Sequence, residues 1–123
     1  MRYLHVALLL LALAPLACAD VARGEIDHLR DYLRNSSCRF VRNGTEFDGA
    51  QAVAHIDRKA GNAGARIHTA EDWIDYAASR SSSSGKAYHV RCGGVDVESG
   101  PWLRDELKRW RAQAPSRTSA DPH

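Results

Sequence analysis

The chain has 123 residues, with 17 Lys and Arg against 15 Asp and Glu, and a formal net charge of +2. This length allows one domain with one modest hydrophobic core. A nearly balanced charge without a clustered basic excess excludes nucleic acid as an expected partner.

Residues 1–19 have the layout of a secretory signal peptide. A charged start, Met-Arg-Tyr-Leu-His, precedes an apolar run over residues 6–16. This run is too short to span a bilayer, so no transmembrane segment is predicted. Residues 17–19 read Ala-Cys-Ala, the small-x-small pattern of a cleavage site, and predict cleavage before Asp20. We therefore expect an exported protein of the cell envelope.

A competing interpretation makes Cys18 the lipid-modified first residue of an envelope lipoprotein. Pro15 stands three positions before Cys18, where a lipoprotein signal carries leucine, and the leucine of this chain falls one position later. The sequence therefore favours cleavage before Asp20.

Two cysteines remain after that cleavage, Cys38 and Cys92. In an oxidising compartment, an even pair in so small a chain predicts one disulfide. In the chain-entropy model, closing a loop of about 54 residues contributes on the order of 4 kcal/mol to the free energy of unfolding. No Cys-x-x-Cys spacing is present, so we expect a structural bridge and not a redox-active one.

Hydrophobic spacing predicts about four helices. The first covers residues 22–35, and the second follows Asp48, which forms a capping-box pattern with Gln51. Gly61 to Gly64 make the end of the second helix doubtful. A third helix is capped by Thr69 with Asp72, runs to about Ser79 and presents an apolar side. A fourth opens at Ser99 and Pro101. The apolar positions are Ile26, Leu29 and Leu33 in the first helix, Ala52, Val53, Ile56 and Ala60 in the second, Trp73, Ile74, Tyr76 and Ala77 in the third, and Leu103, Leu107 and Trp110 in the fourth.

Three short strands are predicted, near residues 38–42, 45–47 and 87–92. Asn43-Gly44 joins the first two, because both residues tolerate the positive φ of a type I′ turn. The third alternates polar and apolar residues and stops at Gly93-Gly94. These elements define one α+β domain over residues 20–112, with helices packed on a small antiparallel sheet and a disordered tail over residues 113–123.

A disulfide between opposed residues also predicts the register of the first and third strands. Pairing Cys38 with Cys92 places Phe40 opposite Val90, and the hairpin places Phe40 opposite Phe47. The apolar side chains then share one face, which must be buried.

Five blocks of the chain, taken in order, resemble the YfeK-like family of small exported bacterial proteins. The family is known only as a domain of unknown function. The resemblance covers residues 24–111 and implies a Gram-negative periplasm, but no activity and no catalytic residue. The chain departs from the family pattern around Gly61 to Ala65. The blocks are Glu25-Ile26-Asp27-His28-Leu29, Cys38-Arg39-Phe40-Val41-Arg42-Asn43-Gly44, Thr69-Ala70-Glu71-Asp72-Trp73-Ile74, Ser84-Gly85-Lys86-Ala87-Tyr88-His89-Val90-Arg91-Cys92 and Trp102-Leu103.

No cofactor is expected. The serine-rich run before Lys86 fails as a phosphate-binding loop, because Arg80 occupies the first glycine position and the predicted order is helix to strand. The histidines at 28, 55, 68 and 89 show no zinc-site spacing. No carboxylate pair stands out for acid and base chemistry, so the sequence leans against an enzyme and nominates no catalytic residue.

Two features point to binding. The predicted register sets Arg39 opposite Arg91, beside Val41 and His89, and like charges directly opposed are unfavourable unless an anion screens them. A carboxylate or phosphate of the envelope would supply that charge through guanidinium hydrogen bonds. Two solvated arginines are the plainer alternative.

The second feature is Ser84-Gly85-Lys86-Ala87-Tyr88, which resembles the SGxxY signature of bacterial lysozyme inhibitors. Those inhibitors are β-rich and this chain is mainly helical, so Tyr88 in the core is the competing interpretation. Taken together, the sequence predicts a non-catalytic module that binds an envelope protein or an anionic envelope ligand. A lysozyme inhibitor and a small envelope enzyme stay open. The candidate binding residues are Arg39, Ser84, Lys86, Tyr88, His89 and Arg91.

Overall fold

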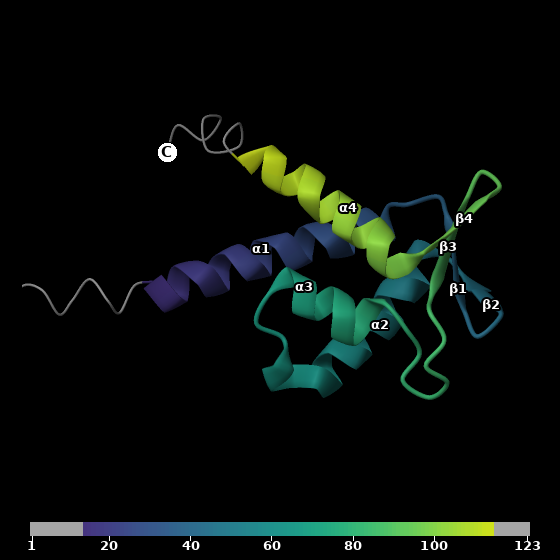
Figure 1. Cartoon of the computed structure of the whole chain (residues 1–123), viewed down its shortest axis with the longest axis horizontal. Coiled ribbons are helices and arrows are strands. Elements are labelled where there is room, and N and C mark those ends of the chain that lie inside the picture. The colour runs from purple at the N-terminus through teal and green to yellow at the C-terminus, as the bar shows by residue number, and fades with distance from the viewer. Residues whose placement is uncertain (1–13, 115–123) are drawn as a thin grey trace, which may run out of the picture.

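The computed structural model describes residues 14–114, which form four α-helices and one antiparallel sheet in the order β2-β1-β3-β4. The strands gather at one end of the molecule and the helices extend away from them (Figure 1). The predicted α+β class and the single disulfide are confirmed. The helices are α1 (Ala14–Arg34), α2 (Gly49–Ala63), α3 (Ala70–Trp73) and α4 (Ser99–Ala112), and the strands are β1 (Arg39–Arg42), β2 (Thr45–Phe47), β3 (His89–Cys92) and β4 (Val95–Glu98).

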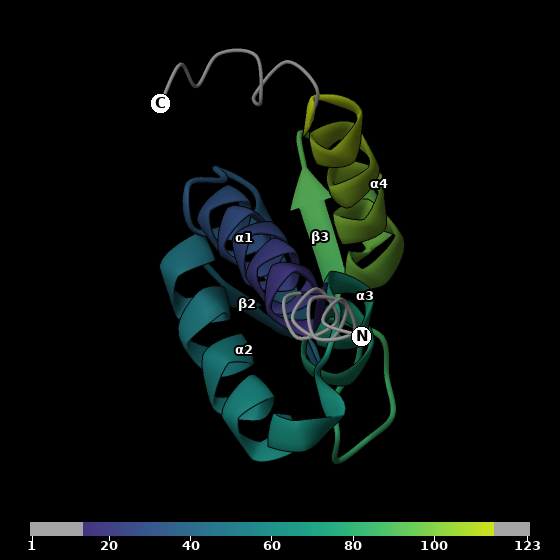
Figure 2. The ribbon, with the colours of Figure 1, turned by 90° about the vertical axis from the view of Figure 1, so that its left-hand side faces the viewer.

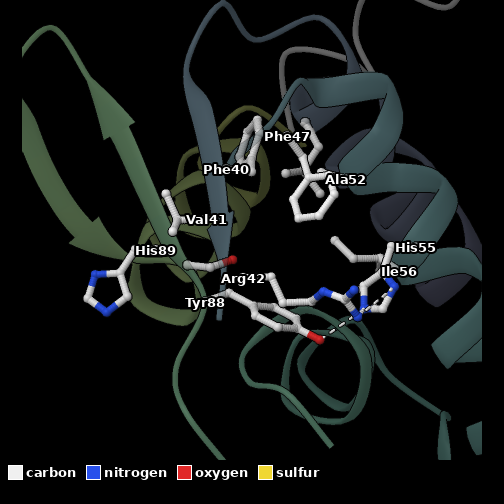
Figure 3. A pocket seen from close by; sticks show the side chains of 11 residues that line it. Phe40, Val41, Arg42, Phe47, Ala52, His55, Ile56, Tyr88 and His89 are labelled. Atoms are coloured by element: carbon white, nitrogen blue, oxygen red, sulfur yellow. Dashed lines mark hydrogen bonds between the residues drawn. The ribbon is translucent and has the colours of Figure 1, made fainter. Parts of the chain in front are cut away.

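The β1–β2 hairpin has the predicted turn and register. Asn43 and Gly44 have φ angles of 50° and 81°, the left-handed values of a type I′ turn. Phe40 opposes Phe47, and both side chains point toward the α2 side of the sheet in Figure 3. Phe40 is 6% exposed and Phe47 packs against the core, so the apolar face of the hairpin is buried as expected.

The predicted pairing of the first and third strands is also confirmed. Phe40 opposes Val90 in the antiparallel β1–β3 pair. The disulfide joins Cys38 and Cys92, whose Cα atoms lie 4.7 Å apart. The bridge therefore closes the start of β1 onto the end of β3.

The three predicted strands are present, and a fourth strand, β4, was not predicted from the sequence. Gly93 and Gly94, with φ angles of 55° and 85°, do not end the sheet but turn the chain back on itself. β4 then pairs with β3, with Val97 opposite Val90. All four residues of β4 are exposed at the sheet edge.

Both predicted capping boxes are present, at Asp48 with Gln51 and at Thr69 with Asp72. The end of α2 falls at Ala63, followed by a 3₁₀ turn over Gly64–Arg66. The third helix departs from the predicted α-helix, because α3 continues as a π-helical segment over Ile74–Ala78. This segment leaves Tyr76 47% exposed, so its predicted place on the apolar side was wrong.

The first helix is longer than predicted, since α1 begins at Ala14 and not near residue 22. Pro15 is compatible with this start because the first helical turn needs no backbone N–H from it. The predicted cleavage site therefore lies within α1 of the uncleaved chain. Residues 1–13 and 115–123, which include most of the predicted signal and tail, lie outside the described residues.

The core lies where α1, α2 and α4 meet the π-helical segment and the inner face of the sheet. Figure 2 shows α1 between α2 on one side and α4 on the other. No described helix is long and apolar enough to cross a membrane. The largest fully buried side chains are Trp73, Leu29, Leu33, Ile74, Leu103 and Val90.

Ion pairs of Arg111 also link α4 to α1 and α3. The Arg111 guanidinium donates to both carboxylate oxygens of Glu25 on α1, at 2.7 and 2.9 Å, and to Glu71 on α3. Glu25 is 8% exposed, so this guanidinium satisfies a carboxylate that the fold buries.

Candidate functional site

The predicted binding face is formed, because the β1–β3 register sets Arg39 opposite Arg91 and Val41 opposite His89. The two flanking strands add carboxylates that the prediction did not consider. Glu46 on β2 lies 3.7 Å from the Arg39 Nε atom and 3.1 Å from an Arg91 nitrogen.

Asp96 on β4 completes this network. One of its oxygens lies 2.7 Å from His89 Nδ1, and the other accepts from Arg91 Nε at 2.9 Å. Hydrogen bonds from Arg91 and His89 lower the pKa of Asp96, and those to Asp96 and Glu46 raise the pKa of Arg91. The opposed arginines are therefore screened by the protein's own carboxylates, and the face needs no external anion to relieve repulsion.

The serine-rich connector is folded onto the hairpin turn. Ser84 Oγ donates to the Asn43 side-chain oxygen at 2.7 Å, and the Asn43 amide donates to Ser81 Oγ at 3.2 Å. Lys86 is exposed, whereas Tyr88 is only 7% exposed. A partner that approaches this loop meets Ser84 and Lys86 but little of Tyr88.

A second group of polar side chains lies around Tyr88, where Figure 3 shows Arg42 and His55 beside the Tyr88 side chain. Lys59 also contacts the Tyr88 hydroxyl, and Arg58 lines the same hollow as Arg42 and His55. We call these five residues, Arg42, His55, Arg58, Lys59 and Tyr88, the Arg42 cluster. His89 points away from the cluster in Figure 3. Of the six predicted binding residues, Tyr88 alone belongs to it.

Hydrogen bonds connect four members of the Arg42 cluster. His55 Nε2 lies 3.2 Å from an Arg42 nitrogen and 3.1 Å from the Tyr88 hydroxyl. Lys59 donates to the same hydroxyl at 2.9 Å, and its ammonium lies 4.8 Å from the centre of the Tyr88 ring. With the lone pair on Nε2, His55 accepts there either from Arg42 or from the Tyr88 hydroxyl. With the proton on Nε2, it donates to that hydroxyl and its Nδ1 atom faces Arg42.

Three separate elements position the Arg42 cluster. Arg42 ends β1, directly before the hairpin turn, and Tyr88 stands directly before β3. His55 and Lys59 are four residues apart on α2 and so lie on one face of that helix. The capping box at Asp48 fixes where α2 begins, and thereby which residues face the sheet.

The environment disfavours further positive charge within the Arg42 cluster. Burial lowers the pKa of His55, and the charges of Arg42, Lys59 and Arg58 lower it further. Burial also lowers the pKa of Lys59, with a second contribution from Arg42. Burial raises the pKa of Tyr88, which keeps the phenol neutral. The cluster thus gathers cations around a neutral histidine and a neutral phenol.

No carboxylate among residues 18–114 forms an ion pair with Arg42, Arg58 or Lys59. A hollow of about 270 Å³ opens beside Arg42 and Arg58, between the hairpin and α2. Its lining includes two guanidinium groups and one imidazole and contains no acid: Arg42, Phe47, Gln51, Ala54, His55 and Arg58. Guanidinium groups bind carboxylates and phosphates through paired hydrogen bonds, so this hollow suits an anion.

A small apolar cavity of about 30 Å³ lies behind the Arg42 cluster, between Phe40, Phe47 and Ile56. Since a single water needs about 10–15 Å³ of such volume, this cavity has room for one or two waters or a methyl group and for no larger part of a ligand. An anion would therefore bind at the surface of the cluster. Within the described residues, no group of three or more His, Cys, Asp or Glu side chains is placed to hold a metal ion.

Sequence reasoning missed the Arg42 cluster, although two local signals were present. His55 and Lys59 have the four-residue spacing of neighbours on a helix face. The strand register also brings Arg42 toward Tyr88. What the sequence lacked was the position of α2 against the sheet.

The fold and the cluster together define a small, disulfide-bonded α+β domain with a cationic surface site. The chain belongs to the DUF5329 family, a family of unknown function whose model matches residues 20–111. It is also similar to the uncharacterised protein YfeK of Salmonella typhimurium strain LT2, with 51% identity over 49 residues. That match spans 40% of this chain and 41% of the Salmonella protein. No solved structure matches the chain.

Proposed function

We propose that the protein is a non-catalytic binding module of the cell envelope that takes an acidic ligand at the Arg42 cluster. The observation that carries this proposal is the set of cations at Arg42, Arg58 and Lys59, which no carboxylate of the described chain neutralises. A carboxylate or phosphate in the hollow would offset their mutual repulsion and accept charge-assisted hydrogen bonds.

The predicted export signal supports an envelope location, with the periplasm as the compartment that the family resemblance implies. The disulfide between Cys38 and Cys92 suits an oxidising compartment. The family match begins at residue 20, the residue that would start the mature chain after the predicted cleavage. A mass measurement of the exported protein tests this part. A lipid-modified Cys18 would contradict cleavage before Asp20.

The sheet face with Arg39, His89 and Arg91 is less suited to bind the same ligand. Glu46 and Asp96 already bind its cations, so an incoming anion would have to compete with them. This face therefore serves as the natural control for the Arg42 cluster.

The decisive experiment is calorimetric titration of the purified protein with inorganic phosphate and, separately, with acetate. We expect Arg42→Gln and Arg58→Gln each to weaken binding of the preferred anion by at least about tenfold, because each removes a guanidinium group that lines the hollow. Arg39→Gln removes one positive charge from the sheet face and should leave the affinity unchanged. Equal losses in all three variants, or no binding of either anion, would contradict the proposal.

Lysozyme inhibition through Ser84 and Lys86 stays an untested alternative. The exposed loop leaves both side chains accessible, while Tyr88 is turned inward. A lysis assay that showed no inhibition at a molar excess of the protein would remove this alternative.

A further inference from the structure

A second hollow, of about 520 Å³, lies beside the disulfide and shares no residue with the Arg42 cluster. It is formed by the last turns of α1, the chain that leads into β1, and Trp102 at the start of α4. Three ring side chains line it, His28, Tyr32 and Trp102, and the bridge between Cys38 and Cys92 forms part of its wall. A hollow of this size is within the range of small-molecule sites.

The rings of this hollow are held in place by packing. Tyr32 and Trp102 have ring centres 4.8 Å apart, and Trp102 meets the buried Phe40 ring edge-on at 5.7 Å. His28 stacks on Trp110 at 3.8 Å, and its Nε2 atom lies 2.6 Å from Glu106. Tyr32 and Trp102 are nevertheless only half-buried. The fold thus keeps rigid aromatic surface in contact with solvent, where a ligand can pack on it.

Short polar groups surround these rings. Asp31 is exposed in the last turn of α1, Asn35 is exposed directly after the helix ends, and Ser36 and Ser37 follow. One Asp31 oxygen accepts from Arg34, while the Asn35 side-chain amide makes no hydrogen bond within the described residues. No lysine or arginine lines the hollow. Its chemistry therefore differs from that of the Arg42 cluster and suits an uncharged ligand rich in hydroxyl groups.

We propose that this hollow binds a short neutral oligosaccharide. A sugar ring presents an apolar face of C–H groups, which packs on an aromatic ring, and a rim of hydroxyl groups. The carboxylate of Asp31 accepts hydrogen bonds from hydroxyls, and the amide of Asn35 both donates and accepts them. The alternation of ring surface and short polar side chains matches both parts of a sugar. This inference is independent of the proposed anion site.

Intrinsic fluorescence provides the test, because Trp102 lines the hollow and Trp110 stacks on His28 in its wall, whereas Trp73 is buried in the core. The purified protein is titrated with trimers of β-1,4-linked N-acetylglucosamine, of cellulose-type glucose and of maltose-type glucose. We expect a saturable change with at least one trimer. No response to all three at millimolar concentration would overturn the proposal, as would binding of an oligoproline peptide in their place.

Matched variants locate the site. Tyr32→Leu removes the aromatic face but keeps apolar bulk, and should weaken binding by about tenfold. Asn35→Leu removes a polar contact from an exposed position and should also weaken binding. Tyr76→Leu, a tyrosine 47% exposed elsewhere, should bind as the unaltered protein does, and so should Arg42→Gln. Thermal unfolding checks that each variant is folded. Full binding by both hollow variants would overturn the assignment.

Discussion

Removal of the disulfide should lower the free energy of unfolding substantially. The bridge joins residues separated by 54 positions, and closing a loop of about this length contributes about 4 kcal/mol in the chain-entropy model. Small domains have free energies of unfolding of about 5–15 kcal/mol, so between about a quarter and four fifths of the total would be lost. For a domain of this size, the same change should lower Tm by about 20 °C.

Urea unfolding of the Cys38→Ser/Cys92→Ser double variant measures this loss directly. The unaltered protein in the presence of a reductant provides a matched control and should show a similar loss. The double variant should not respond to the reductant. A loss below about 1 kcal/mol in the double variant would refute the argument, because the bridge would then constrain the unfolded chain far less than its loop length requires.

Three further changes test the packing and the electrostatics. Gly49→Ala should lower the free energy of unfolding by about 1–3 kcal/mol, since a side-chain carbon at this position would collide with the last carbonyl oxygens of α1. Gly61→Ala is the control in the same helix: its added carbon meets open space, so this variant should be neutral or stabilising. Equal effects of the two variants in denaturant unfolding would contradict the contact at Gly49. Arg111→Met should lower the free energy of unfolding by about 2 kcal/mol, because it leaves the buried carboxylate of Glu25 without its guanidinium partner. An unchanged denaturant midpoint would argue against a stabilising ion pair between Arg111 and Glu25. The pKa of His55 is lower in the folded protein than in the unfolded chain, so the unfolded chain binds a proton first as the pH falls. The free energy of unfolding should therefore decline below about pH 6.5, and this decline should end below the folded-state pKa. In His55→Gln this decline should be smaller, and identical pH profiles for the two proteins would count against a desolvated histidine.

The parts of the fold that the sequence predicted depend on local signals. Asn43-Gly44 specifies its own turn, and the two capping boxes specify where α2 and α3 begin. The disulfide then added one long-range constraint, which was enough to set the β1–β3 register. These features needed no knowledge of how the helices pack.

The sheet face shows why the remaining predictions were incomplete. Arg39 and Arg91 were considered as an isolated pair of opposed residues. The hairpin register already placed Glu46 on the neighbouring strand, and the unpredicted β4 brought Asp96 to the other side. Electrostatic reasoning about two strands therefore omitted both neighbours that decide the balance of charge.

The Arg42 cluster lay further beyond prediction because its members are distant in the sequence. His55 meets Arg42 across 13 positions and Tyr88 across 33, and both contacts depend on how α2 packs against the sheet. Neither helix periodicity nor strand alternation specifies that arrangement. The tertiary structure was needed to bring these groups together.

The titration of His55 in the presence of anion tests the anion site most directly. Ring resonances of the histidines are followed by NMR from pH 5 to 8, first alone and then with inorganic phosphate. We expect a His55 pKa below its ordinary value of about 6.5, and we expect it to rise when phosphate binds beside Arg42 and Arg58 and offsets their charge. A His55 pKa at or above that value that phosphate does not change would rule out the anion site.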